Sequence, residues 1–207
     1  MYLNNIISKT SSVITNPWIP ENLKGKVRSL KTSTHYIYGK KEEKLLGLLL
    51  TSFLHFFDRN GNITYALSLN NEGNILWEYL FKLKDEEHSL ECKCLNDRKE
   101  LIEIFIYKFD EQNKIVEKNC YNGEGALLWS MKDMDKKKKW EPEIECFYNE
   151  FGDIIEQCEI FPSGSKNIVS YQYQYDEHEN WIKQTEYDPI LKKITGIRKR
   201  EIEYYDD

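Results

Sequence analysis

Apolar and polar residues alternate along most of this chain with a period of two. Aromatic and aliphatic side chains take every second position in four clear segments, 53–57, 65–69, 105–109 and 171–175. Successive side chains of a β-strand point to opposite faces of a sheet, so this pattern predicts strands. Near the C-terminus, Gln172 and Gln174 interleave with the tyrosines. We therefore expect one solvated face in that part of the sheet.

A short polar motif recurs between these segments. Each copy has an aromatic or apolar residue, then Asp or Asn, two or three polar residues that usually include Gly or Asn, and then Ile, Leu or Trp. Clear copies begin at Phe57, Leu69, Phe109, Tyr121, Tyr148, Tyr175 and Tyr187. Asp, Asn and Gly tolerate positive φ, and the first two also bond their own backbone. The motif therefore predicts a tight turn at each copy.

The spacing of the copies predicts the architecture. Two interleaved series of anchors repeat at steps of about 26 residues, with 12 to 14 residues from one turn to the next. This leaves about eight or nine residues per strand, and about eleven to fourteen strands in all. We predict an all-β fold, an antiparallel meander of tandem β-hairpin repeats in a strongly twisted or rolled open sheet. Residues 1–24 are expected to be an extended N-terminal segment and residues 25–207 a single β-repeat domain.

Composition restricts the class of partner. The chain has 207 residues and a net charge of −6, so its field repels nucleic acid and anionic lipid and favours a basic partner. No apolar run reaches the roughly 18 residues of a membrane span, and the N-terminus lacks the pattern of a secretory signal. We expect a cytoplasmic protein, or a periplasmic or surface protein if a signal peptide was removed. No membrane insertion is expected.

The repeat resembles a known family. The C-terminal run YQYDEHENWIKQTEYD, the ending RKREIEYYDD and the N-terminal NPWIPENLKGKVRSL carry the resemblance. They are similar to the bacterial YD-repeat, or Rhs-like, family over residues 17–207. Members are mostly β-repeat wrappers, surface proteins and parts of toxin systems, so the resemblance implies architecture and supplies no catalytic residues. The chain departs from the family pattern at Glu179, which replaces a turn glycine, and near residue 135, where a copy is missing.

The aromatic face near the C-terminus is the first candidate site. Tyr171, Tyr173 and Trp181 could stack on a sugar or form a contact surface for a protein. The alternative is that such rings pair across strands and stabilise the sheet. That alternative applies most clearly to Tyr175 and Tyr187, because both are turn anchors.

A basic loop is the second candidate. It consists of Lys136, Lys137, Lys138, Lys139 and Trp140. It could hold an acidic partner or a phosphate, although a charged loop is more often only solvated.

Metal and cofactor chemistry is not indicated. Five cysteines are an odd number without a disulfide pattern, and the single pair Cys92 and Cys94 is too few for a zinc site. The four histidines fall in different repeats. We expect free, half-buried thiols, no metal and no cofactor.

These observations lead to one leading hypothesis about function and two alternatives. We expect a non-catalytic protein-binding β-repeat module that acts as an immunity or adaptor protein in a bacterial Rhs or polymorphic toxin secretion system. Its partner would be another protein, such as a toxin; the sequence leaves the oligomeric state open. One alternative is a surface or periplasmic module that binds glycans through the aromatic face. The other is a hydrolase built on the sheet, which would need a histidine and two carboxylates in one pocket.

Overall fold

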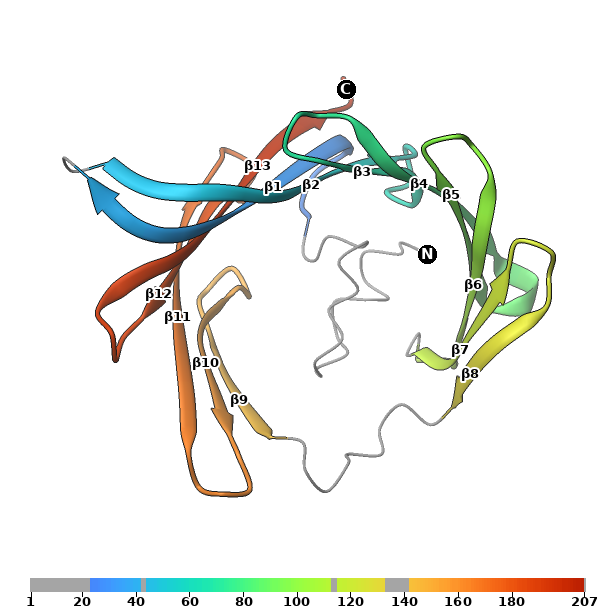
Figure 1. Ribbon diagram of the computed structural model, residues 1–207. Helices are drawn as coiled ribbons and strands as arrows, with labels where there is room; N and C mark the ends of the chain where they lie inside the picture. The colour runs from blue at the N-terminus through green and yellow to red at the C-terminus, as the bar shows by residue number, and fades with distance from the viewer. Residues whose placement is uncertain (1–22, 42–43, 113–114, 133–141, 207) are drawn as a thin grey trace. The chain divides into compact units, whose positions relative to one another are not determined.

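The computed structural model describes residues 23–41, 44–112, 115–132 and 142–206, and these form strands joined by tight turns (Figure 1). The elements are β1 (Val27–Lys41), β2 (Lys44–Phe57), β3 (Ile63–Leu69), β4 (Ile75–Lys84), the short 3₁₀ helix η1 (Asp85–Glu87), β5 (Ser89–Asn96), β6 (Leu101–Phe109), β7 (Ile115–Asn122), β8 (Leu127–Lys132), β9 (Glu143–Tyr148), β10 (Ile154–Ile160), β11 (Lys166–Tyr175), β12 (Trp181–Asp188) and β13 (Lys193–Tyr204). The prediction of an all-β antiparallel meander is confirmed, with 13 strands among the described residues.

The strand order is β8-β7-β6-β5-β4-β3-β2-β1-β13-β12-β11-β10-β9, so the sheet is open, with β8 and β9 at its two ends. Neighbours in this order are consecutive in the chain except where β13 lies beside β1. There the Tyr205 N–H donates to the Lys26 carbonyl at 2.8 Å, and the Ser29 hydroxyl donates to Glu203 at 2.8 Å. Hairpins therefore build the sheet, and one long-range pairing joins the first strand to the last.

Five of the seven predicted turn copies form the same local structure, whereas in the copy at Tyr187 the Asp188 carboxylate accepts the N–H groups of Ile190 and Leu191. In the first, the Asp58 carboxylate accepts the N–H groups of Asn60 and Asn62, both at 2.9 Å, while the Gly61 N–H donates to the Asp58 carbonyl. Asn70, Asn96, Asn122, Asn149 and Asp176 accept the corresponding pairs of backbone amides. The repeated Asp or Asn is thus required because its side chain satisfies two loop amides.

The fourth residue of the turn has positive φ, which explains the recurring glycine. Gly61, Gly73, Gly125 and Gly152 take this position with φ between 79° and 86°. Lys99 and Glu179 occupy the same position with φ of 65° and 61°. Since a Cβ is disfavoured there, these two turns carry a local strain that the glycine turns avoid.

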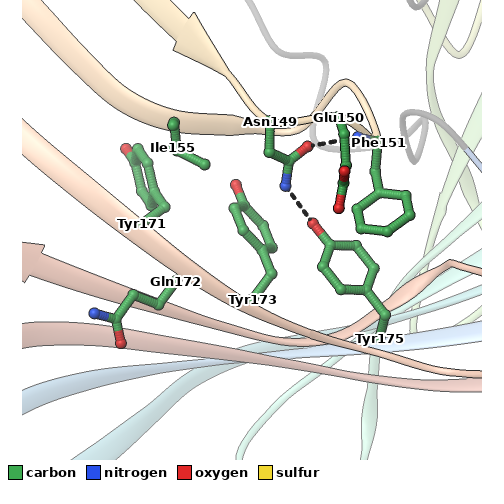
Figure 2. Close-up of a pocket in the computed structure, with 8 residues that line it drawn as sticks. All are labelled: Asn149, Glu150, Phe151, Ile155, Tyr171, Gln172, Tyr173 and Tyr175. Carbon is green, nitrogen blue, oxygen red and sulfur yellow. Dashed lines mark hydrogen bonds between the residues drawn. The ribbon is translucent and has the colours of Figure 1, made fainter.

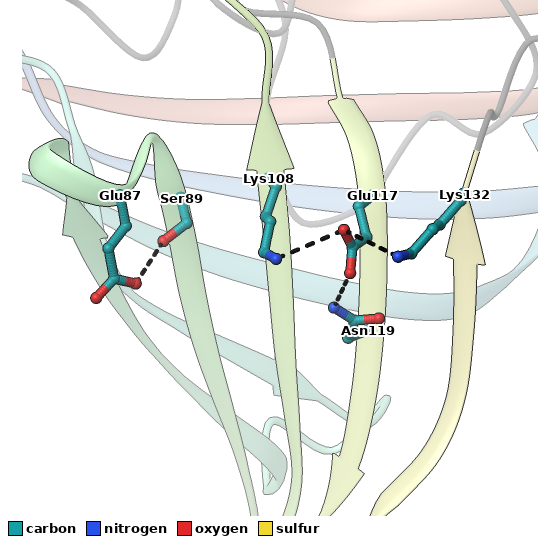
Figure 3. Close-up of polar contacts among 6 residues, drawn as sticks. All are labelled: Glu87, Ser89, Lys108, Glu117, Asn119 and Lys132. Carbon is teal, nitrogen blue, oxygen red and sulfur yellow. Dashed lines mark hydrogen bonds and ion pairs between the residues drawn. The ribbon is translucent and has the colours of Figure 1, made fainter.

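The chain forms two compact units, and the described residues of the first are 23–30, 53–112, 115–132 and 203–206. One sheet face there holds Tyr79, Leu90, Cys92, Tyr107 and Cys120, each at most 5% exposed. The opposite face carries charged residues. Lys108 and Lys132 lie 3.5 and 3.8 Å from Glu117, whose carboxylate also accepts the Asn119 amide (Figure 3).

The described residues of the second unit are 31–41, 44–52 and 142–202. On β11, Tyr171, Tyr173 and Tyr175 are half-buried, whereas Gln172 and Gln174 are exposed. The predicted solvated face is therefore present on this strand.

Candidate functional site

Strand β11 places three tyrosines on one face, and β12 adds the tryptophan predicted with them. Tyr173 and Tyr175 have ring centroids 6.0 Å apart, and Tyr173 lies 6.1 Å from Trp181. The structure therefore brings Tyr173 and Trp181 together, and Tyr171 follows on the same face two residues from Tyr173.

The hydroxyls of Tyr173 and Tyr175 are used by the chain itself. Tyr173 donates to the Ile154 carbonyl at 2.7 Å and accepts from the Gln184 amide at 2.8 Å. Tyr175 donates to Asp153 at 2.9 Å and accepts from Asn149 at 2.6 Å. Tyr173 thereby links β11 to β10 and β12, and Tyr175 links it to the turn before β10, so both tyrosines hold the fold together.

Trp181 is also built into the unit. It is 8% exposed, and the Arg200 guanidinium lies 3.4 Å from the centre of its ring. A tryptophan so covered offers little surface to a partner. Its role as a contact residue for a partner stays a prediction. Its packing against Arg200 and Tyr173 is what the structure shows.

Tyr171 differs from its two neighbours. Its hydroxyl forms no hydrogen bond with any residue that the structure describes. Burial raises the pKa of Tyr171, and Glu186 acts in the same direction while Arg198 opposes it. Burial raises the pKa of Tyr175 to about 12, and its bond to Asp153 adds to this effect.

A shallow hollow lies beside this row of rings. It has a volume of about 560 Å³ and is lined by Asn149, Glu150, Phe151, Ile155, Tyr171, Gln172, Tyr173 and Tyr175. Figure 2 shows the tyrosine rings pointing toward the 149–151 turn and Ile155. The lining includes one carboxylate, that of Glu150, and no histidine. This hollow therefore lacks the histidine and two carboxylates that the hydrolase hypothesis requires.

A second aromatic cluster lies in the first unit and was missed by sequence reasoning. The Lys118 ammonium lies 5.2, 5.1 and 5.4 Å from the ring centres of Phe105, Tyr107 and Trp129. Burial lowers the pKa of Lys118. The register that pairs Tyr107 with Lys118 and Cys120 with Trp129 creates this cluster. Its signal in the sequence was a lysine sharing a strand face with Cys120.

Strand β8 is an apolar strand at one end of the sheet. All six of its residues are exposed, including Leu127 at 56%, Leu128 at 53%, Trp129 at 39% and Met131 at 45%. An exposed, apolar terminal strand is where another strand can add to a sheet. Among the described strands, β8 therefore has both an end position in the strand order and an exposed apolar surface.

The basic loop and the cysteines are the remaining candidates from the sequence. Lys136, Lys137, Lys138, Lys139 and Trp140 lie outside the described residues, as do residues 1–22. All five cysteines are free; Cys92, Cys94, Cys120 and Cys158 are buried, and Cys146 is intermediate.

Metal clusters and membrane-spanning helices are two further features to consider. In the described segments, no cluster of three or more His, Cys, Asp or Glu residues could hold a metal ion. The same segments contain no helix with the length and apolar character needed to cross a membrane.

The comparisons with known proteins give structural likenesses alone. No family model matches the chain, and no curated protein matches it by sequence. A porin-like protein from Bacteroides uniformis is similar at a TM-score of 0.47 and 9% identity, over 87% of this chain and 99% of that chain.

Two toxin structures are more distantly similar. They are the Tc holotoxin pore of Photorhabdus luminescens and a complex of TcdB2, TccC3 and Cdc42. Each is similar at a TM-score of 0.19 and 14% identity, over 81% of this chain. The chain spans 11% of each of those two chains. The fold thus has weak likenesses to β-rich proteins, including Tc toxin chains, and no functional inference rests on them.

Proposed function

We propose that this protein is a non-catalytic binding module that takes an extended segment of another protein along β8. One observation carries the proposal: β8 ends the strand order, and each of its six residues is exposed. Strand addition supplies affinity through main-chain hydrogen bonds and specificity through alternate side chains.

The side chains of β8 favour a partner strand with apolar residues on one face. The cross-strand register puts Trp129 and Met131 on the face of Cys120 and Lys118, and Leu128 and Ser130 on the other. An added strand would cover Trp129 and Met131 with its own apolar side chains, while its second face would meet Ser130 and Lys132. Burying exposed apolar area of this kind contributes about 25 cal/mol per Å² before the costs of association.

The finer part of the proposal is that the partner belongs to a bacterial toxin system and that this chain is its immunity or adaptor protein. The support is the tandem Asx-turn hairpin, which resembles the repeat of Rhs-like proteins. The net charge of −6 adds support, because an acidic protein associates readily with a basic partner.

A crosslinking experiment tests the edge. A photo-crosslinking amino acid at Ser130 in β8 should join the chain to the toxin encoded by an adjacent gene. The same group at Ser68 in β3, a strand inside the sheet order, should not. Crosslinks from Ser130 to a second copy of this chain alone would instead assign β8 to self-association and overturn the proposal.

Paired variants test function in cells. Trp129→Lys should abolish both toxin capture and protection from the toxin, because it places a charge in the contact. Trp77→Lys is the matched control, since Trp77 is 37% exposed, as against 39% for Trp129, but lies on β4 inside the sheet. No protection by the unmodified chain against the toxin of any adjacent gene would remove the immunity role.

A further inference from the structure

We propose that the hollow beside β11 is a site for the guanidinium group of an arginine side chain supplied by a peptide or protein ligand. The site is separate from β8, and the proposal stands on the geometry of residues 149–175.

The first support is an aromatic wall next to a carboxylate. Tyr171, Tyr173 and Tyr175 line the hollow from β11, and Glu150 lines it from the turn before β10 (Figure 2). Glu150 is exposed, so its carboxylate can meet an incoming cation. A planar guanidinium can lie on a ring face and bond a carboxylate at its edge.

The second support is the surrounding charge. Glu150 lines the hollow, and the Asp153 carboxylate accepts the Tyr175 hydroxyl at 2.9 Å. Two carboxylates therefore lie beside the rings, and their negative charge favours a cation over an anionic ligand.

The third support is that several other aromatic rings of the chain have a cation close to them. Arg200 lies over Trp181, Arg59 lies 5.3 Å from the centre of the Tyr205 ring, and Lys118 lies over three rings. By contrast, no cation of the described chain lies over Tyr171, Tyr173 or Tyr175.

A sugar fits this hollow less well. Glycan recognition needs polar groups free to bond several hydroxyls, but the side chains of Tyr173, Tyr175 and Asn149 are already engaged. Tyr171 is the tyrosine of the row whose hydroxyl has no partner among the described residues. A volume of about 560 Å³ is within the range of small-ligand sites and accommodates one long side chain.

The probe is N-acetyl-arginine amide, titrated into the full chain and followed by NMR of the tyrosine rings. We expect weak, saturable binding that shifts Tyr171 first. N-acetyl-citrulline amide, which has nearly the same shape without the charge, should bind at least about fivefold more weakly. N-acetyl-lysine amide tests whether any cation suffices. Equal binding of arginine and citrulline, or binding of maltotriose in place of arginine, overturns the proposal.

Two variants locate the site. Tyr171→Leu should weaken arginine binding at least about threefold, and Glu150→Gln about two- to fivefold, since each removes one contact. Glu150 is on the surface, so its variant should fold even if Tyr171→Leu does not. Tyr36→Leu is the matched control, because Tyr36 is 51% exposed and does not line the hollow. Unchanged affinity in Glu150→Gln and in folded Tyr171→Leu would refute the site, whatever β8 binds.

Discussion

The two aromatic clusters of this protein differ in whether the chain provides the cation itself. In the β6–β8 cluster, Lys118 lies over Phe105, Tyr107 and Trp129. In the second cluster, Trp181 of β12 has Arg200 over its ring, but Tyr171 of β11 has no cation over its ring among the described residues. A ring that already has a cation of the chain beside it makes that interaction within the fold, and a ring without one can accept a cation from a ligand. Tyr171 is therefore the ring of the two clusters that we expect to meet a cationic ligand.

The largest expected contrast is between two tryptophans. Trp181→Ala should lower the free energy of unfolding by about 3–5 kcal/mol, because it empties a buried site beneath Arg200 and beside Tyr173. Trp129→Ala should cost about 1 kcal/mol or less, because Trp129 is 39% exposed on a terminal strand. Urea denaturation followed by circular dichroism measures both. Similar losses for the two variants would mean that the burial of these two rings does not decide how much each contributes to stability.

The two strained turns should respond to glycine with opposite signs. Glu179→Gly should stabilise the second unit by about 0.5–1 kcal/mol, because the residue has φ of 61°. Lys99→Gly should destabilise the first by about 1–3 kcal/mol, because Lys99 pairs with Glu78, which is buried in β4.

Thermal melting of both turn variants checks these signs. Gly73→Ala is the control for backbone strain alone, since an added Cβ there would meet no atom within 4 Å. It should cost about 1 kcal/mol. If Lys99→Gly proved stabilising, the ion pair would contribute less than the turn geometry.

Removing single hydroxyls compares neighbours within one row. Tyr173→Phe should cost about 1–2 kcal/mol, because it leaves the Ile154 carbonyl and the Gln184 amide without their partner. Tyr171→Phe should change stability by less than about 0.5 kcal/mol. Equilibrium unfolding in urea distinguishes them. A large cost at Tyr171 would reveal a structural bond and weaken its candidacy as a ligand contact.

The smallest effect is expected in the pH dependence of the two clusters. Burial lowers the pKa of Lys118 on folding, so its charged form is penalised, and the contribution of Lys118 itself to stability should rise as pH increases toward 10.5. The pKa of Tyr175 is raised to about 12, so its contribution is fully present below pH 10 and is lost as pH rises from 10 to 12.

Unfolding midpoints measured from pH 8 to 11 should show both trends as differences between the wild type and each variant. Lys118→Met should lack the rise, and Tyr175→Phe should lose part of the alkaline fall. If the wild-type curve ran parallel to that of Lys118→Met across this range, folding would not disfavour the charged form of Lys118.

Local patterns predicted the fold well because turn chemistry is local. Asp58, Asn70 and Asp176 cap their own loops, so the positions of the turns, and hence of the strands, follow from residues close in the sequence. The pairing of β13 with β1 was not foreseen, because it depends on residues as far apart as Ser29 and Glu203.

The candidate site was predictable only in outline. The sequence identified the tyrosine row, but it could not show that Tyr173 bonds to Ile154 and Gln184 while the hydroxyl of Tyr171 remains unbonded. The position of Lys118 over three rings depends on the registers of two hairpins, which alternation alone does not determine. The exposure of β8 likewise follows from the strand order as a whole.

The return of the last strand to the first has a consequence for biosynthesis. Hairpins such as β3–β4 and β5–β6 can close while the ribosome is still adding residues, because their contacts are local. One side of β1 has no such early partner: Ser29 waits for Glu203, 174 residues later. Until those residues have been added, one side of β1 presents free main-chain groups to chaperones and to other nascent chains. Completion of this part of the sheet is thus delayed until β13 has been synthesised.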